Sequence, residues 1–190
     1  MVRADDAVAR AERLVALVCR PVEAFATFTA VDAAVVPSPA RELLDHASHM
    51  TVVMERFHGR PLELRVVARI AERPGVDDWY AREILLVDRG GRVVQHGIVR
   101  IDLAQVDPDT ARRIRAATEP LGRVLIEAGL LRDVRAVALL QLHAGARLAA
   151  LVGLPETPPP VLYGRVAEIA LSGSAAPAVQ LLETVVPAVG

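Results

Sequence analysis

The sequence predicts an α+β fold with a single antiparallel β-sheet of about six or seven strands and helices packed on one side. Three observations lead to this prediction. Seven segments have the alternating or apolar pattern of strands. Short turns join several of these segments into hairpins. Four other segments have the residue spacing of helices and follow residues that commonly start a helix. The 190 residues fit one domain, and a hydrophobic content of 53% excludes a disordered protein.

Four helices are predicted. Asp5 or Asp6 can cap the first helix, which we take as an N-terminal addition to the single domain 1–190. Ser38–Pro39, Asp107–Pro108 and Pro120 place proline where a helix tolerates it best, in the first turn. The expected helices cover residues 5–19, 38–46, 108–117 and 120–129.

The remaining regular segments are predicted as strands. Gly90–Gly91 suits the tight turn of a hairpin, and the proline-rich residues 155–160 are expected to form a stiff connector within the domain. The expected strands cover residues 50–57, 61–71, 79–88, 92–103, 133–143, 162–171 and 177–186.

Arg82 and Glu183 each stand alone as the charged residue in the middle of an apolar strand face. Alternation places Arg82 on one face with Tyr80, Ile84 and Leu86, and it places Glu183 among apolar residues of the last strand. An unpaired buried charge is costly, so each group needs a partner, either the other one or a ligand. A small polar anion would satisfy both.

Composition excludes several function classes. A net charge of −1 gives no basic field for nucleic acid or an anionic membrane. All 22 basic residues are Arg, which excludes lysine Schiff-base and P-loop chemistry. The lone Cys19 and five scattered histidines lack metal-site spacing, so we expect no metal and no cofactor. Without a secretory or membrane-spanning segment, we expect a cytoplasmic protein of undetermined oligomeric state.

The two predicted hairpins resemble each other. Tyr80-Ala81-Arg82 precedes a strand, a turn and Gln95, and Tyr163-Gly164-Arg165 precedes a strand, a turn and Gln180. If this is a repeat, the hairpins would face each other across a cavity with Arg82 and Arg165 as anion clamps. A chance likeness between two amphipathic hairpins explains the pattern equally well.

Four short motifs follow one another along the chain: Met50-Thr51, Trp79-Tyr80-Ala81-Arg82-Glu83-Ile84-Leu85-Leu86, Glu119-Pro120-Leu121-Gly122-Arg123 and Leu182-Glu183. A further segment is Met54-Glu55-Arg56-Phe57-His58. In this order and spacing they resemble the chorismate pyruvate-lyase family, in particular its actinobacterial 4-hydroxybenzoate-forming branch. The resemblance covers roughly residues 40–187 and leaves out the first helix.

The resemblance implies an enzyme that eliminates pyruvate from chorismate without a cofactor, a carbon–oxygen lyase. By position, Arg82 would pair with the ring carboxylate, backbone N–H groups of Met50 and Leu121 would also bind it, and Glu183 would bind the ring hydroxyl, or act as a base. A second cation is needed for the enolpyruvyl carboxylate. Arg165, Arg100 and Arg123 are candidates, and the hairpin likeness favours Arg165.

Two other functions stay open. The same fold is shared with effector-binding domains of transcription regulators, so the chain could bind a small aromatic acid without catalysis. It could also be a divergent enzyme of secondary metabolism that acts on a related acid. Alternatively, Arg82 and Glu183 could form an ion pair with a purely structural role, in which case their burial would not indicate a binding site.

Overall fold

The computed structural model describes residues 4–71, 78–154, 161–171 and 176–187. These residues form one antiparallel sheet of seven strands, in the order β1-β5-β6-β7-β4-β3-β2, which confirms the predicted fold class. The strands are β1 (Ala26–Val31), β2 (Glu63–Ala71), β3 (Trp79–Val87), β4 (Val93–Asp102), β5 (Leu131–Ala144), β6 (Val161–Leu171) and β7 (Pro177–Val185).

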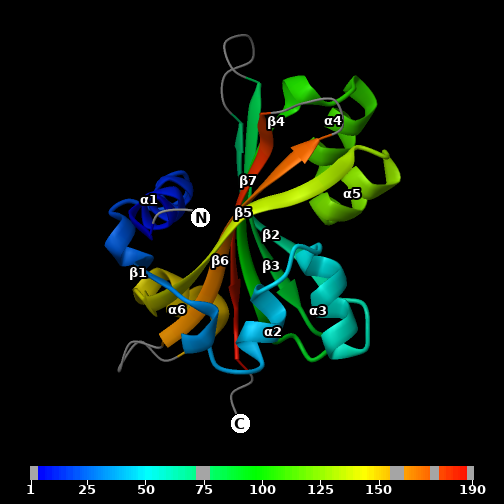
Figure 1. Cartoon of the computed structure of the whole chain (residues 1–190). Coiled ribbons are helices and arrows are strands. Elements are labelled where there is room, and N and C mark those ends of the chain that lie inside the picture. The colour runs from blue at the N-terminus through cyan, green and yellow to red at the C-terminus, as the bar shows by residue number, and fades with distance from the viewer. Residues whose placement is uncertain (1–3, 72–77, 155–160, 172–175, 188–190) are drawn as a thin grey trace.

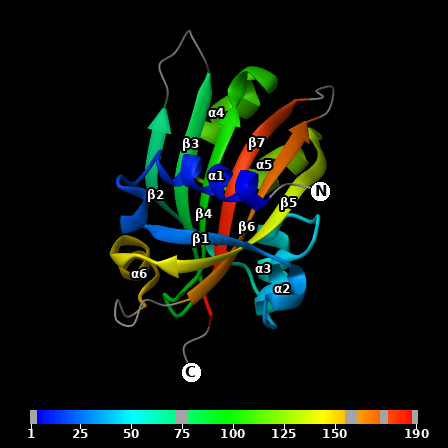
Figure 2. The same cartoon turned by 60° about the vertical axis from the view of Figure 1, so that its left-hand side comes forward.

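Helices pack on both faces of this sheet. In Figure 1 the sheet is seen nearly edge-on, with α2, α3, α4 and α5 on one side and α1 and α6 on the other; Figure 2 shows α1 crossing in front of the strands. The predicted one-sided arrangement therefore holds for α2, α4 and α5, whereas α1 packs on the other face through its own apolar residues. The helices are α1 (Ala4–Val15), α2 (Ala40–Leu44), α3 (Met50–His58), α4 (Pro108–Ala116), α5 (Leu121–Glu127) and α6 (Ala146–Val152).

Three clusters of buried apolar side chains hold these layers together. One joins α1, β1 and α6 to the sheet through residues such as Ile98 and Leu182. The other two lie on the opposite face, one under α4 and α5 and one under α2 and α3. Side-chain alternation along β7 explains this division, since Leu181 and Leu182 point to opposite faces.

The segment 50–57 is a helix, and its prediction as a strand was wrong. Met50 and Met54 are buried while most residues between and after them are not, which is the spacing of one helix face. The helix ends at Gly59, whose φ of 65° lies in the left-handed region that favours glycine. The helix α6 and the strand β1 were not predicted, and the proline-rich connector 155–160 lies outside the described residues.

The two similar hairpins lie side by side in the same sheet and do not face each other. β4 pairs with β7, so β3 and β6 lie on the outer sides of this central pair. Arg82 and Arg165 point from the same face of the sheet, toward α2–α5, since Arg82 contacts Glu119 before α5 and Arg165 contacts Leu44 of α2.

Candidate functional site

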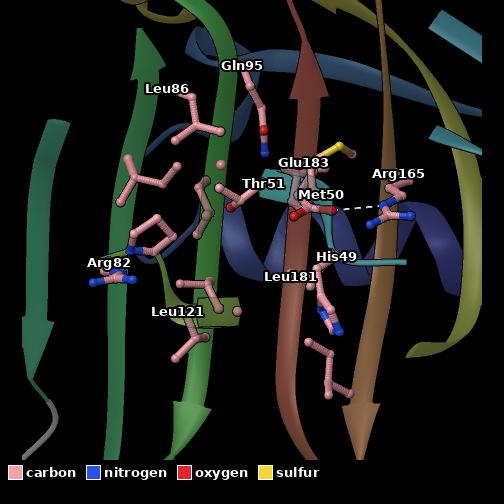
Figure 3. A pocket seen from close by; sticks show the side chains of 18 of the residues that line it. His49, Met50, Thr51, Arg82, Leu86, Gln95, Leu121, Arg165, Leu181 and Glu183 are labelled. Atoms are coloured by element: carbon pink, nitrogen blue, oxygen red, sulfur yellow. Dashed lines mark hydrogen bonds and ion pairs between the residues drawn. The ribbon is translucent and has the colours of Figure 1, made fainter. Parts of the chain in front are cut away.

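A cavity of about 80 Å³ lies between the sheet and the first turns of α3 and α5. Its floor includes Arg82 of β3, Gln95 of β4, Arg165 of β6 and Glu183 of β7. Figure 3 shows these side chains with Met50, Thr51 and Leu121 from the two helices. The sheet thus brings together residues that are a hundred positions apart in the sequence.

Arg82 is buried, at 2% exposure, without a carboxylate within salt-bridge distance among the described residues. Its Nη2 donates to the carbonyl oxygen of Glu119 at 2.9 Å, whereas its buried Nη1 has no hydrogen-bond partner in this part of the chain. Burial lowers the pKa of the Arg82 guanidinium, and Arg69 lowers it further, whereas the neighbouring Tyr80 raises it. A buried cation without a carboxylate partner is costly, and an anionic ligand would offset the cost.

Glu183 does not pair with Arg82, because the register separates them. Arg82 lies opposite Val99, and Glu183 lies opposite Gly97 on the far side of β4, so the two are two strand spacings apart, roughly 10 Å. Glu183 Oε2 instead accepts from Arg165 Nε at 2.8 Å. The alternative of a structural Arg82–Glu183 pair is therefore excluded, and the cavity separates these two groups (Figure 3).

Arg165 is 1% exposed and holds the segment between α2 and α3. Its Nη1 donates to the carbonyl oxygens of Leu44 (3.3 Å) and His46 (2.6 Å), and its Nη2 donates to that of Ser48 (3.2 Å). Arg165 thus lines the cavity with its nitrogen atoms engaged. Its geometry is that of a group that orients Glu183 and the start of α3.

Met50 and Leu121 are the first residues of α3 and α5, where backbone N–H groups lack partners within the helix. Neither helix has a side-chain cap, since the preceding residues are His49 and Pro120. The two helix starts are in contact, because a Cβ on Gly122 would lie 3.6 Å from the Cβ of His49. Unsatisfied N–H groups at such positions favour an anion, the same charge that Arg82 requires.

Gln95 and His49 also line the cavity, and neither was predicted as a ligand-binding residue. Gln95 is buried, and its Oε1 has no partner among the described residues, so a donor group on a ligand could reach it. Burial lowers the pKa of His49, and burial together with Arg165 lowers that of His46. Both imidazoles are therefore neutral near pH 7 and leave Arg82 as the cationic end.

Arg123 lies apart from this site. Its side chain is half exposed, and its Nη2 lies 3.6 Å from Glu55 Oε1 on the surface. Arg100, the remaining candidate cation, has its guanidinium 3.9 Å above the ring of Trp79.

A second polar cluster is buried on the opposite face of the sheet. Glu83 Oε1 accepts from His96 Nε2 (2.9 Å) and from Arg147 Nη1 (2.7 Å). Burial alone would raise the pKa of Glu83, but the hydrogen bonds from Arg147 and His96 outweigh burial and lower it to about 2. Arg147 is the second residue of α6 and lies near Phe25, so this cluster fixes α6 on the sheet, and it takes no part in the cavity.

Within the described ranges no cluster of His, Cys, Asp and Glu residues has the arrangement of a metal site. Among those same residues, no helix is both long and apolar enough to cross a membrane.

Comparisons with known proteins bear on the fold. Neither a family model nor a curated protein matches the sequence. Several solved structures are similar to this chain. The effector domain of PhnF from Mycobacterium smegmatis is 19% identical with a TM-score of 0.53, over 72% of this chain and 87% of that one. The ligand-binding domain of a protein described as a GntR-family regulator from Bordetella bronchiseptica is 14% identical with a TM-score of 0.51, over 67% and 86%. PhnF itself is 17% identical with a TM-score of 0.52, over 73% of this chain.

This chain spans 63% of the length of the PhnF chain. At these identities the likeness shows a shared fold. The fold is that of the ligand-binding and effector domains of transcription regulators, which is also the chorismate lyase-like fold that the motifs implied.

The comparisons contradict the prediction of a chorismate lyase. The matching structures are described as regulator domains that bind ligands or effectors. Glu183, which the resemblance offered as a hydroxyl-binding group or a base, accepts a hydrogen bond from Arg165 Nε through its Oε2.

Proposed function

We propose that this chain is an effector-binding domain that holds a small organic anion non-covalently in the cavity between the sheet and the starts of α3 and α5. The observation that carries the proposal is the buried Arg82, which lines the cavity and whose Nη1 has no hydrogen-bond partner in the described residues. Natural proteins rarely leave such a donor unsatisfied, and a binding site for an acceptor accounts for it.

The positions of the polar groups define the ligand. Its anionic group lies at Arg82 and at the N–H groups of Met50 and Leu121, and a donor such as a hydroxyl lies at the other end, near Glu183 and Gln95. Apolar side chains, including Ile84 and Leu181, lie between these ends. A volume of about 80 Å³ is well below the roughly 300–1,000 Å³ of drug-sized sites, which favours a ligand with one ring at most.

Titration calorimetry with 4-hydroxybenzoate tests the proposal, with benzoate as the analogue that lacks the donor. We expect both acids to bind the parent protein, with benzoate the weaker. The Arg82→Gln variant should bind 4-hydroxybenzoate about 10- to 150-fold more weakly, since a charge-assisted hydrogen bond contributes about 1.5–3 kcal/mol. Arg112→Gln on the exposed side of α4 is the matched control and should bind like the parent.

Two results would overturn the proposal. One is equal affinity of the parent and Arg82→Gln proteins for 4-hydroxybenzoate, which would place the acid elsewhere. The other is release of pyruvate on incubation with chorismate, because a domain that only binds effectors does not perform an elimination.

A further inference from the structure

A second and larger cavity, of about 420 Å³, lies between α2, α3 and the ends of β6 and β7 that carry Val161 and Val185. It shares no described lining residue with the cavity of Arg82 and Glu183. Its volume lies within the range of about 300–1,000 Å³ typical of small-molecule sites. The cavity is therefore large enough for a ligand of its own.

The interior of this cavity is apolar. Leu43, Met54, Leu162 and Val185 line it, and each is at most 6% exposed. Toward the surface its lining includes Phe57, which is 49% exposed although it is a large aromatic residue. Apolar surface that stays in contact with water favours an occupant with an apolar body.

The polar part of the lining is basic. Arg92 lines the cavity, and Asp88 binds its Nε and Nη2 at 3.2 Å, so Nη1 is not engaged in the described part of the chain. His58 lies beside it, and burial followed by the charge of Arg92 lowers the pKa of His58, so its ring is a neutral donor near pH 7. Ser38 also lines the cavity, but its hydroxyl is held by Glu42 at 2.5 Å. A carboxylate would accept hydrogen bonds from Arg92 and His58.

We propose that this cavity is a second ligand site, which takes an amphipathic monocarboxylate with its apolar chain among Leu43, Met54, Leu162 and Val185 and its carboxylate at Arg92 and His58. The lining combines apolar residues with Arg92 and His58, and such an acid combines an apolar chain with a carboxylate. The site depends on residues other than Arg82 and Glu183, so it stands or falls independently of the proposed effector site.

Titration of the full chain with sodium decanoate below its micelle concentration tests the proposal, with 1-decanol as the uncharged analogue. We expect one molecule of decanoate to bind, and decanol to bind more weakly. Arg92→Gln should weaken decanoate about tenfold, the usual effect of losing one charge-assisted hydrogen bond at a partly exposed site. The control is Arg89→Gln in the same β3–β4 turn, which is exposed and does not line the cavity.

A second variant tests the apolar interior. Ala40→Phe enlarges a half-buried side chain at the start of α2 that lines the cavity, and it should abolish decanoate binding while 4-hydroxybenzoate binding stays unchanged. The inference fails if Arg92→Gln and Arg89→Gln bind decanoate equally well, or if decanoate binding is lost in Arg82→Gln and kept in Ala40→Phe. It also fails if the parent protein binds no decanoate. In that case, if the parent is a dimer and Phe57→Ser makes it a monomer, this face is a contact between two copies of the chain.

Discussion

Arg82 and Arg165 offer a sharp test, because one substitution should have opposite effects at the two positions. Both guanidinium groups are at most 2% exposed and point from neighbouring hairpins into the same cavity. They differ in their partners. Arg165 is bound by Glu183 and by three backbone carbonyl groups, whereas Arg82 Nη1 has no partner in the described residues.

Methionine has a similar length and no charge, so Arg→Met removes the guanidinium with little change in packing. At Arg82 the change removes a desolvation cost of about 1–3 kcal/mol and loses the hydrogen bond to Glu119, about 1 kcal/mol. Glu119 is partly exposed, so water can replace that bond. We expect the unliganded protein to gain about 1 kcal/mol, which raises Tm by about 2–4 °C for a chain of this size.

At Arg165 the same change leaves Glu183 and three carbonyl groups without their donor. Breaking a buried ion pair on one side costs about 3–5 kcal/mol, so Tm should fall by about 6 °C or more. Thermal and urea unfolding followed by far-ultraviolet circular dichroism, without ligand, measure both changes. If Arg82→Met destabilises the protein as much as Arg165→Met, then Arg82 is a structural residue and the argument for a ligand at Nη1 is refuted.

Three further predictions follow from single contacts. In calorimetry, Glu183→Gln should weaken the binding of 4-hydroxybenzoate about tenfold and the binding of benzoate much less, because only 4-hydroxybenzoate has a hydroxyl to donate. Equal losses of affinity for the two acids would mean that the ligand does not reach Glu183. The pKa of Glu83 is about 2 in the folded protein and 4.5 in the unfolded chain, so the unfolded chain binds more protons in acid. The resulting stabilisation is complete above pH 4.5, and about 3 kcal/mol of it is lost as the pH falls through 2. Urea titrations should find this loss smaller in Glu83→Gln. Gly145→Ala places a Cβ 2.5 Å from the carbonyl oxygen of Ala24 and should cost about 1–3 kcal/mol in thermal unfolding, whereas Gly90→Ala, which meets only the side chain of Asp88, should cost less.

The sequence was sufficient for the strands whose signal is local. Alternation and the Gly90–Gly91 turn placed β3 and β4 within about one residue of their observed ends, and Asp107 caps α4 as expected, with its carboxylate accepting from the backbone N–H groups of Asp109 and Thr110. These features depend on neighbours in the chain. They are therefore visible without knowledge of the tertiary structure.

The failures have a common physical cause, which is that tertiary contacts override local patterns. Residues 50–57 include Thr51, Val52, Val53 and Phe57, which suit a strand, yet burial of Met50 and Met54 on one face makes the segment a helix. The strand β1 is short and is stabilised by pairing with β5, more than a hundred residues away in sequence. A glycine in the left-handed position after a helix, as at Gly59, was the one local signal that could have corrected the first error.

The candidate site shows the same division between what is local and what is not. Arg82 and Glu183 could be selected because each interrupts an apolar stripe, but the partner of each is set by strand register, which pairs Arg165 with Glu183 and leaves Arg82 to the cavity. The partnerless Gln95 Oε1 adds a second buried polar atom on the same surface. Two such atoms lower the stability of the empty protein, and replacing them with apolar groups would be an easy way to recover it. Their presence around one cavity is therefore best explained by an occupant whose acceptor and donor groups complete both.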